Sequence, residues 1–105
     1  MAWLILLAAS GVEILMALAL KYSHGWTRPW PSALGLVAAL GSVFLLTYAM
    51  RNLPAGTAYA IWTGIGSVGI SLLGIFLFGE SAAPVRLACI ALIVVGMVGL
   101  KLVEA

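Results

Sequence analysis

The chain contains four long apolar runs, separated by short segments that hold most of its charged, proline and glycine residues. These runs predict helices at about residues 3–21, 32–50, 57–78 and 84–103. Each run is close to the roughly 20 residues that a helix needs to cross the hydrocarbon core of a bilayer. Strands of a membrane barrel would alternate apolar and polar residues, so the continuous runs exclude a barrel. The pattern predicts an all-α integral membrane protein in which residues 1–105 form one domain of four transmembrane helices.

The composition of the chain indicates that lipid is its main solvent. Of 105 residues, 65% are hydrophobic and 8% are charged, whereas soluble domains contain about 45–50% apolar and about 25% charged residues. The five Lys and Arg residues are scattered and do not form the clustered basic surface that binds nucleic acid. The sequence holds neither a His/Cys metal cluster nor a nucleophile–base pair, so we expect no enzyme activity, no metal site and no cofactor.

The positive charges are almost evenly divided between the two sides of the membrane. If all four runs span it, one side carries Arg51 and Lys101. The other side carries Lys21, Arg28 and Arg86. Because the Lys and Arg bias of short loops sets orientation, this near balance leaves two interpretations open. Either lipid or packing fixes one orientation, or the chain inserts both ways and pairs with an inverted copy as an antiparallel, dual-topology homodimer.

Glu13 is the charged residue that falls well inside an apolar run. An acidic residue near the bilayer midplane costs about 2.5–3.5 kcal/mol on insertion scales, and no Lys or Arg inside a run can neutralise it. One explanation is a protonated carboxyl that hydrogen-bonds between helices. The other is a proton-coupled site, because a carboxyl that lipid drives towards its neutral form can release the proton and take a cation in exchange. A signal peptide has a basic segment before its apolar run and no acidic residue within the run. Because no Lys or Arg precedes the first run and Glu13 interrupts it, we expect this run to be retained.

The residues one helical turn from Glu13 predict a cavity on its face. Ala9 and Ala17 are small enough to let another helix or a ligand approach closely. Ser10 and Met16 complete the face. Because helical side chains lean towards the N-terminus, the carboxylate reaches the level of Ser10. The Ser10 hydroxyl then either donates to the carboxylate or bonds back to its own helix.

The third run places aromatic and polar residues on one helical face. This face contains Tyr59, Trp62, Thr63 and Gly66, at an i, i+3, i+4, i+7 spacing. Tyr and Trp usually lie at the membrane interface. Inside a span they indicate either interhelical packing or a cation site, since aromatic faces attract cations. Gly64 and Gly66 predict a kink or hinge, because glycine is tolerated in membrane helices where neighbouring helices satisfy the backbone.

The fourth run carries a stripe of mostly small residues and has no polar residue in its middle. Such stripes mark close helix–helix contact. We expect this helix to form the dimer, with packing inside the chain as the alternative. The expected interface consists of Ala88, Ala91, Val95, Gly96 and Gly99.

The sequence closely resembles the small multidrug resistance family, and within it the guanidinium-exporter subtype. The resemblance extends over essentially the whole chain. It is most specific in ALKYSxGxTR at 19–28, LPxGTAYAIWTGIG at 53–66 and GLK at 99–101.

This resemblance implies an antiparallel homodimer of four-helix subunits in a bacterial inner membrane, which exchanges protons for a cationic substrate. The central Glu of the family corresponds to Glu13, its site Ser to Ser42, and its site aromatics to Tyr59 and Trp62. From the residues alone, Ser42 is also the best candidate for a polar contact from the second run. Thr63 is expected beside this site as a residue that influences specificity.

Two positions differ from the pattern of the subtype. Met16 stands where a Trp is usual, and Ser10 stands where a Gly is usual. A flexible thioether in place of a rigid indole predicts a wider or more adaptable pocket. We therefore expect the chain to accept substituted guanidines, such as guanylurea-like or alkylguanidinium cations, alongside guanidinium.

Two other functions remain open from the sequence. A multidrug exporter of quaternary ammonium or aromatic cations would use the same carboxyl. A small non-transporting subunit of a membrane assembly would have no need for a carboxylate at mid-membrane beside small and aromatic residues. Pairing with a homologous chain of opposite orientation is a further alternative to self-pairing.

Overall fold

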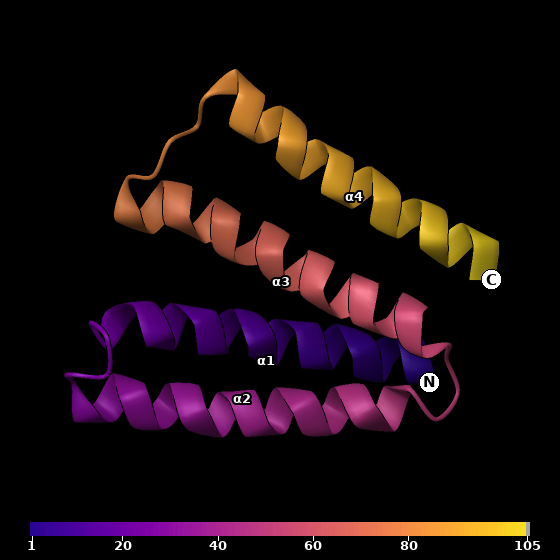
Figure 1. Cartoon of the computed structure of the whole chain (residues 1–105), viewed down its shortest axis with the longest axis horizontal. Coiled ribbons are helices and arrows are strands. Elements are labelled where there is room, and N and C mark those ends of the chain that lie inside the picture. The colour runs from indigo at the N-terminus through magenta and orange to yellow at the C-terminus, as the bar shows by residue number, and fades with distance from the viewer. Residues whose placement is uncertain (105) are drawn as a thin grey trace.

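The computed structural model describes residues 1–104, and the side chains of residues 1–103, as four helices joined by short connectors. All four are long and apolar enough to cross a membrane, which confirms the expected all-helical membrane fold (Figure 1). Their bounds are Ala2–Tyr22 for α1, Pro29–Ala49 for α2, Ala55–Phe78 for α3 and Pro84–Glu104 for α4.

α2 and α3 begin a few residues earlier than the sequence pattern predicts, because proline is compatible with the start of a helix. α2 begins at Pro29 rather than residue 32, and Pro31 also lies in its first turn. The N–H groups of a first turn have no partner inside the helix, so proline loses nothing there. α3 begins at Ala55, directly after Pro54 as its N-cap residue, rather than at residue 57.

The helices form a flat subunit with principal-axis extents of 41 × 34 × 16 Å. α1 lies between α2 and α3, while α4 packs mainly against α3 (Figure 1). α3 and α4 are closest at the end that carries the C-terminus and diverge towards the connector between them (Figure 1). The short dimension is little more than the diameter of one helix with its side chains, about 10–12 Å, so the subunit approximates a single layer of helices.

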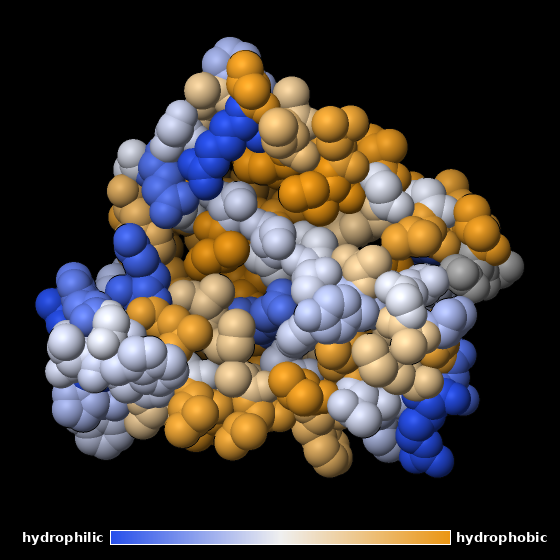
Figure 2. All heavy atoms as spheres, viewed as in Figure 1, coloured by the Kyte–Doolittle hydropathy of each residue, from blue (hydrophilic) through white to orange (hydrophobic). Residues whose placement is uncertain are grey.

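The buried core of the subunit is small. It is a cluster on α1, α2 and α3, and α4 contributes no buried residue among those described. Most large apolar side chains are exposed instead, and Figure 2 shows hydrophobic residues over much of one face, with most of the hydrophilic residues at its margins and a smaller group near its centre. The surface is therefore suited to lipid or to a second subunit. The core cluster consists of Leu6, Ala9, Leu46, Ala49, Ala58 and Ile61.

Glycines allow α1 to approach both of its neighbours closely. A Cβ atom added to Gly35 of α2 would lie 2.7 Å from Cδ2 of Leu20. A Cβ atom added to Gly69 of α3 would overlap Cδ1 of Ile14. In lipid, helices associate through such close contacts, because apolar burial itself provides no driving force between them.

Candidate functional site

Glu13 lies near the middle of α1 and faces α3 at Gly66. A Cβ atom added to Gly66 would overlap the Glu13 carboxylate. The carboxylate fits there only because α3 has no side chain at this position. The two helices thereby hold the half-buried Glu13 side chain between them, far from either end of α1.

A cavity of about 210 Å³ opens beside Glu13. No residue in the described part of the chain donates a hydrogen bond to the carboxylate. A carboxylate in a membrane interior needs a proton, a cation or a donor to offset its desolvation. The cavity therefore offers an acidic group that is free to take a proton or a small cation. Besides Glu13, the cavity is lined by Met16, Ala17, Thr63, Gly66, Ser67 and Ile70.

Ser10 does not hydrogen-bond Glu13. Its hydroxyl donates to the backbone carbonyl of Leu6 at 2.8 Å, and its side chain is fully buried. Of the two alternatives, the structure shows the bond back to the same helix, which satisfies a hydroxyl in apolar surroundings without a partner from another helix. Donation from Ser10 to the carboxylate, the other alternative, is not observed.

Ser42 connects three helices through its hydroxyl. The hydroxyl donates to the backbone carbonyl of Ala9 at 2.7 Å and accepts a hydrogen bond from Trp62 Nε1 at 2.8 Å. Ala9 is one turn from Glu13 on α1, and Trp62 is one turn from Gly66 on α3. The Ser42–Trp62 pair is therefore one helical turn from the carboxylate, and it fixes the indole ring. In this conformation the indole N–H bonds Ser42 rather than the carboxylate.

Tyr59 and Thr63 lie on the same face of α3 but have different surroundings. Thr63 lines the Glu13 cavity, and its hydroxyl donates to the backbone carbonyl of Tyr59 at 2.8 Å. The Tyr59 side chain is 54% exposed, and its ring centroid lies 5.5 Å from that of Trp62. The subunit alone thus brings Thr63 to Glu13 and leaves Tyr59 facing outwards.

Two residues of the cavity were missed by the sequence interpretation. Ser67 and Ile70 follow Thr63 and Gly66 at the i+4 and i+7 positions of the same face. Continuing the helical spacing beyond Gly66 would have found them. The aromatic and glycine residues that mark this face end at Gly66, so the prediction ended there as well.

Gly64 and Gly66 serve as close-contact positions in this conformation. A Cβ atom on Gly64 would lie 2.5 Å from Sδ of Met97 on α4, while Gly66 accommodates Glu13. α3 continues as one helix through both glycines. The hinge at these residues stays a prediction.

The small-residue stripe on α4 lies away from α3. α4 contacts α3 at Gly64 through Ile93 and Met97. At about 100° per residue, the stripe is centred on the opposite side of the helix, about 160° from this contact. A Cβ atom added to Gly96 or Gly99 would meet nothing within 4 Å. The other helices of the chain therefore leave the stripe largely uncovered, and its role as a dimer interface stays a prediction.

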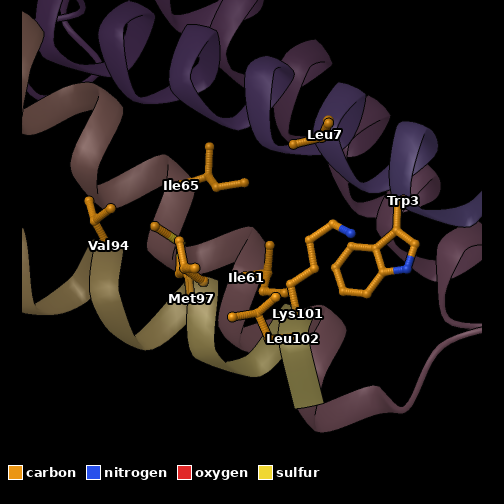
Figure 3. Close-up of a pocket in the computed structure, with 9 residues that line it drawn as sticks. Trp3, Leu7, Ile61, Ile65, Val94, Met97, Lys101 and Leu102 are labelled. Atoms are coloured by element: carbon orange, nitrogen blue, oxygen red, sulfur yellow. The ribbon is translucent and has the colours of Figure 1, made fainter. Parts of the chain in front are cut away.

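A second cavity, of about 270 Å³, lies between α1, α3 and α4 near the chain termini (Figure 3). Its walls are apolar, and Lys101 extends over the ring of Trp3, with Nζ 4.7 Å from the ring centroid (Figure 3). A fixed positive charge and the absence of any carboxylate from this lining disfavour a cation here. Of these two cavities, the one at Glu13 is suited to cation binding.

Comparison with known proteins identifies the family of the chain. Residues 1–93 match the family model described as Small Multidrug Resistance protein. The guanidinium exporter of Yersinia pseudotuberculosis serotype I (strain IP32953) is 58% identical over 102 residues, which cover 97% of this chain and 98% of that protein. The guanidinium exporters of Escherichia coli (strain K12) and Citrobacter freundii are 54% and 53% identical, each over 97% of both chains.

These matches confirm the resemblance that the motifs indicated, and they agree with four helices able to span a membrane. They also confirm that the chain is a multi-pass membrane protein. The chain belongs to the small multidrug resistance family.

Proposed function

We propose that the chain is a proton-coupled antiporter that exports guanidinium and substituted guanidinium cations across the bacterial inner membrane. The observation that carries this proposal is Glu13, a carboxylate at mid-helix that opens on a cavity and receives no hydrogen bond from the described residues. The proposal is supported by full-length relatives named guanidinium exporters, which are transporters rather than enzymes.

The chemistry of guanidinium matches that of the Glu13 site. The ion is planar and presents N–H donors in a fork whose spacing fits the two oxygens of a carboxylate. In a cavity with mostly apolar walls, this charge-assisted contact is stronger than it would be in water. Glu13 therefore supplies both the charge and the geometry that select this class of cation.

Protons and substrate compete for the same carboxylate in this mechanism. Protonation of Glu13 removes the negative charge that holds the cation, so the apparent affinity for guanidinium falls as the pH falls. Binding of guanidinium, in turn, displaces the proton. Because each species excludes the other, an inward proton gradient drives the cation outwards.

The working unit that we propose is an antiparallel homodimer with two Glu13 carboxylates facing one shared cavity. Three observations support it: the near balance of positive charges, the flat shape of the subunit, and the small-residue stripe of α4 on the face away from α3. Two inverted copies that exchange conformations convert an inward-open cavity into an outward-open one. This is alternating access built from two chains rather than from an inverted repeat within one chain.

Met16 supports the acceptance of larger guanidines. It lines the Glu13 cavity directly, and its unbranched thioether can move aside for a substituent. We expect Met16→Trp to narrow the cavity and lower the transport of guanylurea and alkylguanidinium relative to guanidinium by about tenfold, since a misfit in a pocket costs about 1–3 kcal/mol. An unchanged ratio of large to small substrates would show that Met16 does not set the width of the site.

The competition for Glu13 is tested by proton release. Guanidinium is added to the detergent-solubilised protein in weakly buffered solution, and the pH is recorded. We expect a fall in pH with the native protein and with Glu13→Asp, which retains a carboxylate, and no change with Glu13→Gln. Proton release that persists in Glu13→Gln would overturn the role of this residue.

A further inference from the structure

The Glu13 cavity contains a hydroxyl whose hydrogen-bonding capacity is unused. Two hydroxyl side chains line the cavity, Thr63 and Ser67. The Thr63 hydroxyl already donates to the Tyr59 carbonyl at 2.8 Å. The exposed Ser67 hydroxyl makes no hydrogen bond within the described part of the chain.

Ser67 differs in this respect from several other hydroxyls on the helices. Four of them bond to the carbonyl four residues before them in the sequence, which is the usual way to satisfy a hydroxyl in an apolar environment. Ser67 could do the same with the Thr63 carbonyl but does not. Its oxygen is therefore available to whatever occupies the cavity. The four back-bonded hydroxyls are Ser10, Ser32, Thr47 and Thr63.

The position of Ser67 places it at the level of the carboxylate. It directly follows Gly66, which contacts the Glu13 carboxylate, and it lines the same cavity. The flanking cavity residues Met16 and Ile70 are apolar. A cation held by Glu13 would therefore find one unengaged polar side chain beside it in this subunit, the Ser67 hydroxyl.

We propose that Ser67 is a specificity-determining residue, which contacts the part of the guanidinium cation that Glu13 does not hold; this rests on the proposed function. Guanidinium carries N–H donors on all three nitrogens, and a carboxylate accepts from only two of them in a forked contact. The Ser67 oxygen has two lone pairs and accepts from the remaining nitrogen. An alkyl group on that nitrogen replaces one of its two N–H donors and brings an apolar group next to the Ser67 hydroxyl. The hydroxyl thus favours unsubstituted guanidinium, or a polar substituent such as that of guanylurea, over an alkylguanidinium.

The test compares two variants of nearly equal size, Ser67→Thr and Ser67→Val, which differ in the hydroxyl. Uptake of guanidinium and of ethylguanidinium is measured in proteoliposomes, and the ratio of their kcat/KM values is taken. We expect Ser67→Val to lower this ratio about fivefold, as expected for one lost hydrogen bond, and Ser67→Thr to retain most of it. Ser71→Val is the matched control, because Ser71 lies one turn further along α3 and outside the cavity lining.

The possible results separate the two proposals. If the native protein transports guanidinium but Ser67→Thr and Ser67→Val have the same substrate ratio, the role of Ser67 is overturned. The proposed function is not affected by that result. An equal loss in Ser67→Val and Ser71→Val would also overturn the role of Ser67, because the effect would then be general to α3. A native protein that transports neither cation would overturn the proposed function and the Ser67 assignment with it.

Discussion

Glu13 and Gly66 fit together as a side chain and the gap that receives it. The sequence predicted that Glu13 is functional, because an acidic residue at mid-membrane is costly to keep. It did not predict which glycine faces the carboxylate, since this depends on the rotation of α1 against α3. The bond that Ser10 makes and the Ser42–Trp62 pair depend on tertiary contacts in the same way.

The fit between Glu13 and Gly66 predicts that Gly66→Ala abolishes transport while the protein still folds. The new methyl group must displace the carboxylate, and a displacement of about 1 Å at a reacting group can cost about 100-fold in rate. The measurement is guanidinium uptake by protein that elutes as the native species does. Gly11→Ala is the control, because a Cβ atom there meets nothing within 4 Å. Equal activity of both variants would contradict the contact.

Ser42→Ala is expected to destabilise the protein by about 1–2 kcal/mol, because it leaves the Trp62 N–H without its acceptor. Unfolding in a denaturing detergent measures this change, and Trp fluorescence reports the freed indole. Thr47→Val on the same helix removes a hydroxyl that is exposed and bonds only to the Val43 carbonyl. We expect a change of less than about 0.5 kcal/mol there. Similar losses of stability in both variants would mean that the Ser42–Trp62 hydrogen bond contributes no more to stability than the exposed Thr47 hydroxyl does.

Four helices could be predicted from the sequence because each apolar run has membrane length and is ended by charged residues, proline or glycine. The starts of α2 and α3 could be located less well, because proline is compatible with a first turn. Helical spacing alone groups the small residues of α4 on one face. It could not show whether another helix of the chain covers that face, and the structure shows that α3 contacts the opposite side.

The exposed stripe of α4 predicts that a bulky residue on it weakens self-association. Ala91→Phe should shift the protein from dimer to monomer, because a ring prevents the close approach that small residues permit. Light scattering coupled to size exclusion in detergent measures the oligomeric state. Val37→Phe is the control, since Val37 is 67% exposed on α2 and lies outside the stripe. A fully dimeric Ala91→Phe protein would place the interface elsewhere.

The subunit is a flat layer with a short dimension of 16 Å, and about half of the Tyr59 side chain is exposed. Both features fit a site that a second copy completes. The near balance of positive charges favours an inverted copy. The balance of positive charges could be predicted from the sequence. The flat shape could not, because it depends on how all four helices pack together.

Two variants whose Lys and Arg residues favour opposite orientations are therefore expected to be inactive when each is expressed alone. Transport should return when the two variants are expressed together. The first variant has three cations on the side of the N-terminus and one on the other side, and it combines Lys21→Gln, Arg28→Gln and Asn52→Lys. Arg51→Gln alone leaves one against three. Each form should insert in a single orientation, lack guanidinium uptake when expressed alone, and regain it on co-expression. Full activity of either form alone would contradict an antiparallel dimer.

The most direct test of a proton-coupled guanidinium exporter is electrical current from proteoliposomes. Guanidinium, guanylurea and a tetraalkylammonium ion are compared, with Glu13→Gln as the control. We predict currents for the two guanidine compounds that disappear in Glu13→Gln. Currents that persist in Glu13→Gln would remove the carboxylate from the mechanism, a current for tetraalkylammonium alone would indicate a multidrug exporter, and silence for every cation would contradict transport altogether.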